Sequence, residues 1–108
     1  MLKGILDGCI LAIIKEKEVY GYELAEKLEQ YGFTSFSEGT IYPLLLRMEK
    51  EGLLTSTLRK STAGPRRKYY SLSKKGLKEL DEFVKRWVTL KENVNNVLKH
   101  QKHNSMEG

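Results

Sequence analysis

Cysteine, proline and histidine are scarce in this chain. Its 108 residues include one cysteine, two prolines and two histidines. A single cysteine cannot form an internal disulfide framework, so we expect a reducing, cytoplasmic location. Both histidines lie near the C-terminal end, and the sequence has no Ser/His/Asp set, no glycine-rich phosphate loop and no metal-ligand cluster. We therefore expect neither enzyme activity nor a metal or other cofactor.

Long apolar runs are also missing. No run approaches the roughly 20 residues that a membrane-spanning helix needs, so no membrane association is expected. The apolar N-terminal stretch is interrupted by Asp7 and has no small-residue cleavage site, which argues against a signal peptide. A hydrophobic content of 40% and a charged content of 31% are typical of one globular domain of this length.

Positive charge is concentrated in the second half of the chain. Residues 1–52 hold 6 Lys and Arg against 9 Asp and Glu, whereas residues 53–108 hold 13 against 5. The segment 59–68 carries five cations and no acid. A generic solvated surface intersperses the two signs, so this segment indicates a polyanionic partner.

The central stretch, residues 36–54, is predicted to be a short amphipathic helix. Its apolar side chains recur at helical spacing, namely Ile41, Leu44, Leu45 and Met48. Gly52 is the expected C-terminal cap, and Ser37 or Thr40 the expected N-terminal cap. Because a proline is best tolerated in the first turn, Pro43 predicts regular helix from about Thr40, with 37–39 as a loose entry.

The opposite face of this helix carries small, hydroxylated or cationic residues: Ser37, Gly39, Thr40, Tyr42 and Arg47. Such a face allows another polymer to approach closely. A solvated face with an ordinary cap explains the same residues, so this stretch alone leaves both interpretations open.

Two further helices precede it. Apolar residues at helical spacing predict a first helix over 2–16, in which Cys9 is read as a small buried hydrophobe. Gly21 and Gly32 bracket a second helix that buries Leu24 and Leu28. With the central helix, this arrangement is a helix-turn-helix.

After Gly52 the apolar period changes to that of strands. Residues 53–60 and 68–72 are predicted to form a two-stranded hairpin around a turn-rich linker, with Arg66, Arg67 and Lys68 at its tip. A lone hairpin is only marginally stable in water, so it should pack on the helices. Exposed cations also protect edge strands, which is the plain alternative for these three residues.

A long last helix is predicted from Ser73 to about Lys99. Its apolar stripe comprises Leu77, Leu80, Val84, Trp87, Val94 and Leu98, widened by Phe83, Leu90 and Val97. One face of a small domain cannot bury so long a stripe, so we expect a second copy of the chain to cover part of it. His100 and His103 lack a third ligand nearby, and residues 101–108 are expected to form a disordered tail.

The predicted fold is mainly α with a small antiparallel hairpin, in the order α-α-α-β-β-α of a winged helix-turn-helix. Four segments together resemble the PadR-like transcriptional regulators: Tyr20-Gly-Tyr-Glu-Leu24, Ser37-Glu-Gly-Thr-Ile-Tyr-Pro-Leu44, Arg47-Met-Glu-Lys-Glu-Gly-Leu53 and Gly64-Pro-Arg-Arg-Lys-Tyr-Tyr-Ser-Leu-Ser-Lys-Lys-Gly76. The resemblance covers roughly residues 2–90, and the length is similar to that of the short subfamily. Ser73 and Ile41 stand where Thr and Leu are commoner.

This resemblance implies a homodimeric regulator, usually a repressor, that binds double-stranded DNA at an inverted repeat. It divides the chain into a DNA-binding domain (1–72), a dimerisation helix (73–100) and the tail. The implied DNA-binding residues are Tyr22, Ser37, Gly39, Thr40, Tyr42, Arg66, Arg67 and Lys68. The first and last helices would form the dimer through Leu6, Leu80, Phe83, Val84, Trp87, Leu90 and Val94.

Two questions stay open at this point. Relatives often respond to small aromatic molecules, so Trp87 is a candidate effector-binding residue, although it would equally fill a dimer core. The winged helix could instead be a protein-interaction module without DNA binding, but such a module should carry an acidic or apolar wing. Steep loss of affinity with salt would distinguish a DNA-binding protein from that alternative.

Overall fold

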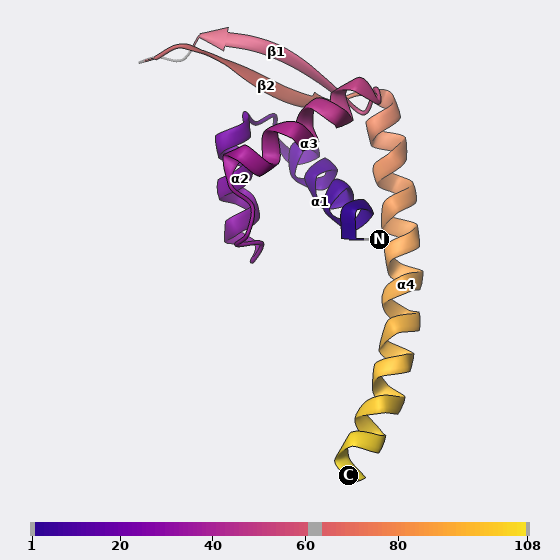
Figure 1. Cartoon of the computed structure of the whole chain (residues 1–108). Helices are drawn as coiled ribbons and strands as arrows, with labels where there is room; N and C mark the ends of the chain where they lie inside the picture. The colour runs from indigo at the N-terminus through magenta and orange to yellow at the C-terminus, as the bar shows by residue number, and fades with distance from the viewer. Residues whose placement is uncertain (1, 61–63, 108) are drawn as a thin grey trace.

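The computed structural model describes residues 2–60 and 64–107, with side chains described over 4–60 and 64–101. Its elements are α1 (Leu2–Glu16), α2 (Gly21–Gln30), α3 (Glu38–Lys50), β1 (Leu54–Lys60), β2 (Arg66–Leu72) and α4 (Lys74–Glu107). The predicted element order and the antiparallel hairpin are confirmed (Figure 1). Part of the predicted turn, residues 61–63, lies outside the described residues.

The core lies between α1, α2 and α3, beneath the hairpin (Figure 1). Each helix contributes the apolar stripe that its spacing predicts. The side chains with no exposed surface are Ile10, Leu24, Leu28, Ile41, Leu45 and Met48. The packing of the three helices therefore buries the apolar face of α3 and turns its polar face toward solvent.

Helix α3 begins two residues earlier than predicted, at Glu38 rather than Thr40. The backbone N–H groups of Thr40 and Ile41 both donate to the Ser37 carbonyl oxygen, each at 3.0 Å. These bonds close the first turn before the chain reaches Pro43, so the proline removes only the bond to the Gly39 carbonyl. Ser37 caps the helix through its backbone, and its side chain makes no capping bond.

The other end of α3 closes as predicted. Gly52 has a φ of +82°, a left-handed conformation that glycine adopts without a Cβ clash. Its N–H donates to the Glu49 carbonyl at 3.0 Å, and the Leu53 N–H donates to the Met48 carbonyl at 3.0 Å. This pair of bonds is a Schellman motif, and it turns the chain from α3 into β1.

The hairpin of β1 and β2, called the wing below, is longer than predicted. Its register runs from Leu54 opposite Leu72 to Lys60 opposite Arg66. Arg66, Arg67 and Lys68 therefore lie within strand β2, and the prediction that they occupy the tip is wrong. The wing is joined to the α1–α2 connection, where Val19 and Tyr70 exchange two backbone hydrogen bonds at 2.8 and 3.3 Å.

Helix α4 starts at the base of the wing, passes α1 and extends well beyond the other helices (Figure 1). A Cβ at Gly8 would lie 2.4 Å from the Phe83 ring, so α1 and α4 approach closely here. The helix has 34 residues and ends at Glu107, not near Lys99 as predicted. No glycine or proline occurs between 100 and 107, so nothing in the backbone stops the helix where a disordered tail was expected. Within the described ranges, no helix is suited to crossing a membrane.

Candidate nucleic-acid interface

The N-terminal half of α3 presents an open, polar surface. Ser37, Gly39 and Thr40 are exposed, and the two hydroxyl oxygens, Ser37 Oγ and Thr40 Oγ1, lie 3.4 Å apart. A Cβ added at Gly39 would meet only the Ser37 hydroxyl, at 3.8 Å. The backbone of the first turn is thus directly accessible, as close approach to another polymer requires.

Tyr42 and Tyr22 extend this surface to α2. Tyr42 is 43% exposed and Tyr22 is 46% exposed. The Tyr42 ring lies so close to Gly21 that a Cβ there would be 2.6 Å away from it. Gly21 therefore allows the start of α2 and the first half of α3 to form one continuous surface.

Tyrosine rings connect this surface to one face of the wing. The Arg67 guanidinium carbon lies 4.4 Å from the ring centroid of Tyr20, and that of Arg59 lies 5.3 Å from the ring centroid of Tyr69. The Tyr20 and Tyr69 rings meet edge to face at 5.4 Å. Cation–π contacts of this kind hold arginines in place while their N–H donors still reach solvent.

Tyr20 is a residue that the sequence reading missed as part of the site. The sequence signal was an aromatic residue directly before a helix start, but its partner Arg67 lies 47 positions away. Only the fold brings the two together.

The other face of the wing is held by one carboxylate of α3. Lys68 Nζ lies 2.8 Å from Glu49 Oε1, and the Ser56 hydroxyl donates to Glu49 Oε2 at 2.6 Å. These contacts, the Lys68 hydrogen bond first, lower the pKa of Glu49, while the same bond raises the pKa of Lys68. Of the three wing cations predicted to meet phosphate, Lys68 is thus already paired within the chain, whereas Arg66 is exposed.

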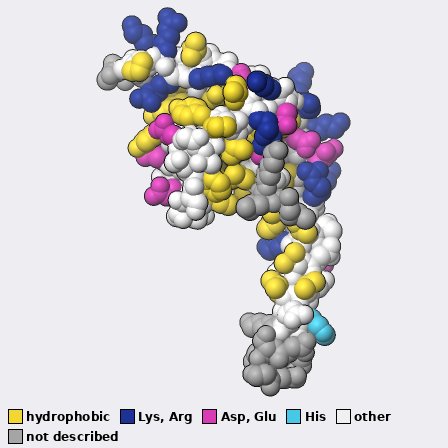
Figure 2. All heavy atoms as spheres, viewed as in Figure 1, with side chains coloured by type: hydrophobic (Ala, Val, Ile, Leu, Met, Phe, Trp, Pro, Cys, Tyr) yellow, Lys and Arg dark blue, Asp and Glu magenta, His cyan; other side chains and the backbone are white. Residues whose placement is uncertain are grey.

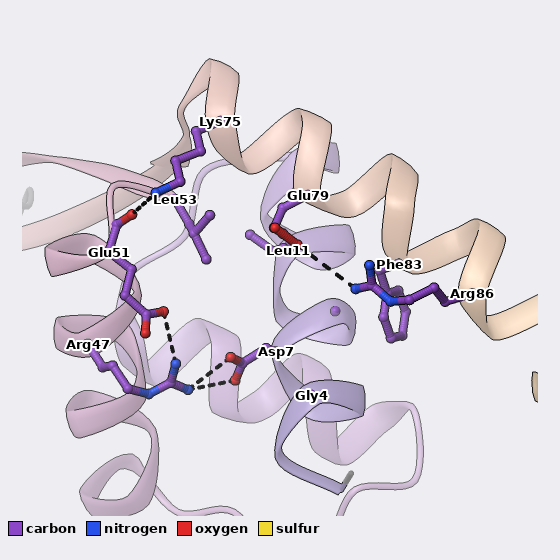
Figure 3. Close-up of a pocket in the computed structure, with 11 residues that line it drawn as sticks. Gly4, Asp7, Leu11, Arg47, Glu51, Leu53, Lys75, Glu79, Phe83 and Arg86 are labelled. Carbon is purple, nitrogen blue, oxygen red and sulfur yellow. Dashed lines mark hydrogen bonds and ion pairs between the residues drawn. The ribbon is translucent and has the colours of Figure 1, made fainter.

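Arg47 does not lie on the displayed face, contrary to prediction. Its guanidinium reaches α1 and donates to both Asp7 oxygens, at 2.7 and 3.0 Å, and to Glu51 at 3.0 Å (Figure 3). The Asp7 hydrogen bond is the largest of several causes that raise the Arg47 pKa above its ordinary value. Arg47 therefore connects two helices of one chain.

The predicted dimer surface divides into two groups. Leu6 and Leu80 are buried inside the single chain, at 6% and 5% exposure, so they leave little surface for a partner. Val84, Trp87 and Val94 are exposed on α4, whereas Phe83 and Leu90 are partly buried. Apolar side chains follow the projecting part of α4, while Lys and Arg gather over the wing (Figure 2).

A cavity of about 350 Å³ adjoins Trp87. It lies where the start of α1 meets α4, and its lining residues are Gly4, Ile5, Phe83, Arg86, Trp87 and Leu90. Within the part of the chain that the structure describes, no three His, Cys, Asp or Glu side chains form a metal-binding group. The His103 side chain lies outside the described residues, so the predicted absence of a histidine metal site is not tested.

Comparisons with known proteins identify the family. The family model for the transcriptional regulator PadR-like family matches residues 10–82. The crystal structure of a PadR-like transcriptional regulator from Bacillus cereus is 58% identical, with a TM-score of 0.83, and covers 91% of this chain and 95% of that one. Transcriptional regulator Rv3488 of Mycobacterium tuberculosis is 34% identical over 99 residues, which are 92% of this chain and 88% of that protein.

The chain therefore belongs to the PadR-like family of transcriptional regulators, as the sequence motifs predicted. This family and these relatives are regulators rather than enzymes, which confirms the expectation of no enzyme activity. The crystal structure of Bacillus subtilis PadR in complex with operator DNA is also similar, at 26% identity and a TM-score of 0.68. That match covers 74% of this chain and 45% of PadR.

Proposed function

We propose that this protein is a repressor that binds an inverted-repeat operator as a homodimer. The observation that carries the proposal is the continuous surface formed by the first half of α3, the start of α2 and the face of the wing that carries Arg59 and Arg67. The similarity to an operator-bound PadR supports the same assignment. In this proposal residues 1–72 bind DNA, and residues 73–100, which include most of α4, provide the dimer contact.

The proposed roles follow from the exposure of each residue. Ser37, Gly39, Thr40 and Tyr42 enter the major groove, where base edges carry the sequence information. Tyr22, Arg66 and Arg67 contact backbone phosphates and supply most of the affinity. Lys68 remains a candidate phosphate contact, but it must share its charge with Glu49.

The first experiment measures DNA binding by fluorescence anisotropy. The probe is the duplex directly upstream of this protein's own gene, compared with a scrambled duplex at low and physiological salt. We expect the native duplex to bind more tightly, with an affinity that falls steeply as salt rises. The double variant Arg66→Ala/Arg67→Ala should lower the magnitude of the slope of log affinity against log salt by about 3.6, because the dimer loses two phosphate contacts on each chain and each contact contributes about 0.9.

The matched control is Lys78→Ala/Lys85→Ala. It removes the same charge from two exposed lysines on the side of α4 opposite the apolar stripe. Its salt slope should stay close to that of the wild-type protein. Equal slopes for the two double variants would contradict the role of the wing, and salt-independent binding would favour the protein-interaction alternative.

The homodimer is proposed from the exposed apolar residues of α4. Val84, Trp87 and Val94 are each at least 41% exposed in the single chain. Burial of such a stripe against a second copy removes apolar surface from water on both chains. Sedimentation should give a dimer for the wild-type protein and a folded monomer for Val84→Glu/Val94→Glu, with Leu58→Glu on the wing as the control that stays dimeric.

We further propose that a planar aromatic effector binds beside Trp87 and weakens DNA binding. The cavity of about 350 Å³ next to Trp87 supports this idea. Trp87 is the only tryptophan, so its fluorescence reports this position alone. Acridine should quench the emission and raise the concentration of wild-type protein needed for DNA binding. It should not raise that concentration for Trp87→Leu, which separates binding beside Trp87 from intercalation of acridine into the duplex; an equal effect on both proteins would contradict the proposal.

A further inference from the structure

Three helices meet at a cavity of about 480 Å³ between α1, the end of α3 and the first half of α4 (Figure 3). Charged side chains of both signs line it, from all three helices. Its ion pair between Arg86 and Glu79, at 3.9 Å, lies within α4. The Arg47–Asp7 pair is different because it joins α3 to α1.

The geometry of that pair is well suited to fixing an angle. Both Asp7 oxygens accept from one nitrogen of Arg47, and the second Arg47 nitrogen donates to Glu51, which directly follows α3. The Arg47 and Asp7 side chains are only 25% and 20% exposed. A partly buried, charge-assisted contact is stronger and more directional than a surface ion pair.

Asp7 is also adjacent to a close contact between α1 and α4. Gly8 lies directly beneath the Phe83 ring, where even a Cβ would be 2.4 Å from ring atoms. The contacts thus run without a gap from Arg47 on α3, through Asp7 and Gly8 on α1, to Phe83 on α4. Rotation of α3 on α1 would have to break the ion pair, and sliding of α1 on α4 would have to displace the ring.

We infer that the Arg47–Asp7 pair is a positioning contact that sets the angle of α3 relative to α4, and so selects the spacing between the two DNA half-sites. The inference rests on the proposed function, in which α4 forms the dimer and α3 enters the groove. One extra base pair turns the second half-site by about a tenth of a helical turn. A dimer with α3 held at one angle should therefore prefer one spacer length strongly.

The test uses inverted repeats that the wild-type protein enriches from a randomised duplex library. Affinity is measured on the preferred repeat and on repeats with the spacer shortened or lengthened by one base pair. For Asp7→Asn and Arg47→Gln, we expect the preference for the best spacer to fall about fivefold. A purely structural loss would weaken binding to every spacer by the same factor and leave that preference unchanged.

Glu79→Gln is the matched control. It removes a carboxylate from the same cavity, but its ion pair with Arg86 does not cross between helices. Its spacer preference should equal that of the wild-type protein. Before binding is compared, far-ultraviolet circular dichroism establishes that each variant is folded, and sedimentation establishes that it is a dimer.

A measurement without DNA keeps the inference separate from the proposed operator binding. Nitroxide labels are placed on Thr40→Cys in a Cys9→Ser background. The distance between the two α3 helices of the dimer is then measured by pulsed electron paramagnetic resonance. Asp7→Asn should broaden the distance distribution, and Glu79→Gln should not. Unchanged distances together with an unchanged spacer preference would overturn the inference. Failure of the wild-type protein to enrich any duplex would overturn the proposed function, and the distance measurement would still test whether the ion pair fixes the angle of α3.

Discussion

The two ends of helix α3 contain similar numbers of polar residues but face different surroundings. At the first end, Ser37, Glu38, Gly39 and Thr40 are all exposed. At the second end, Arg47 binds Asp7 on α1, and Glu49 binds both strands of the wing. The difference teaches that polarity on a helix does not identify the free surface; what matters is whether another element of the chain already supplies a partner.

The same contrast applies to the cations of the wing. Glu49 pairs with Lys68 on one face, and Glu18, from the α1–α2 connection, forms an ion pair with Arg59 on the other. Carboxylates of the helical domain thus hold the wing on both sides. In the proposed function Arg66 and Arg67 contact an external polyanion, and Lys68 is a further candidate that shares its charge with Glu49.

The largest expected effect is on the free energy of unfolding. It appears when a glycine beyond the second end of α3 is compared with a glycine at the first end. At Gly76, in the first turn of α4, a Cβ would lie 2.1 Å from the backbone oxygen of Leu53, which follows α3. Because a backbone atom cannot give way as a flexible side chain can, Gly76→Ala should lower the free energy of unfolding by about 3 kcal/mol in urea denaturation. Gly39→Ala should leave it unchanged or raise it slightly, since its Cβ would meet only Ser37 Oγ at 3.8 Å. Equal losses in both variants would contradict the contrast.

An intermediate effect is expected from Thr40→Val, which removes a hydroxyl while preserving the shape of an exposed side chain. If Thr40 lies in the major groove, the dimer loses one base contact in each half-site, so affinity for the operator should fall about a hundredfold, at about tenfold for each contact. Affinity for a scrambled duplex should be unchanged. Thr55→Val makes the same substitution on an exposed position of β1 and is the control; an equal loss there would place the specificity elsewhere.

The smallest expected effect is on the stability of the protein at acid pH. Because the Glu49 pKa is lowered in the folded state, the stabilisation from this carboxylate is complete above its ordinary value of 4.5 and is lost as pH falls through the folded pKa. Glu49→Gln should therefore flatten the acid side of the stability curve by up to about 1 kcal/mol, since its side chain is still 27% exposed. Urea denaturation between roughly pH 6 and roughly pH 3 measures the free energy of unfolding across this range. Glu26→Gln, at an exposed position on α2, is the control that should leave the curve unchanged.

Local pattern predicted most of the fold. Helical spacing of apolar residues located α1, α2 and α3, and glycine at 52 located the end of α3. The predicted start of α3 was two residues too late, because Ser37 caps the helix with its carbonyl oxygen rather than with its side chain. The wing was longer than predicted because pairing with Arg59 and Lys60 makes a strand of Arg66 and Arg67, which resemble a turn when β2 is read alone.

The candidate site was predictable where a residue acts alone and unpredictable where it needs a partner. The sequence by itself determined the family, the exposed first turn of α3 and the cationic wing, because these depend on residues that are close in the chain. Only the tertiary structure decided that Arg47 turns inward to Asp7, that Lys68 is paired with Glu49 and that Tyr20 supports Arg67. Each of those outcomes depends on a partner 19 to 47 residues away, and spacing within a helix or strand carries no information about such a distance.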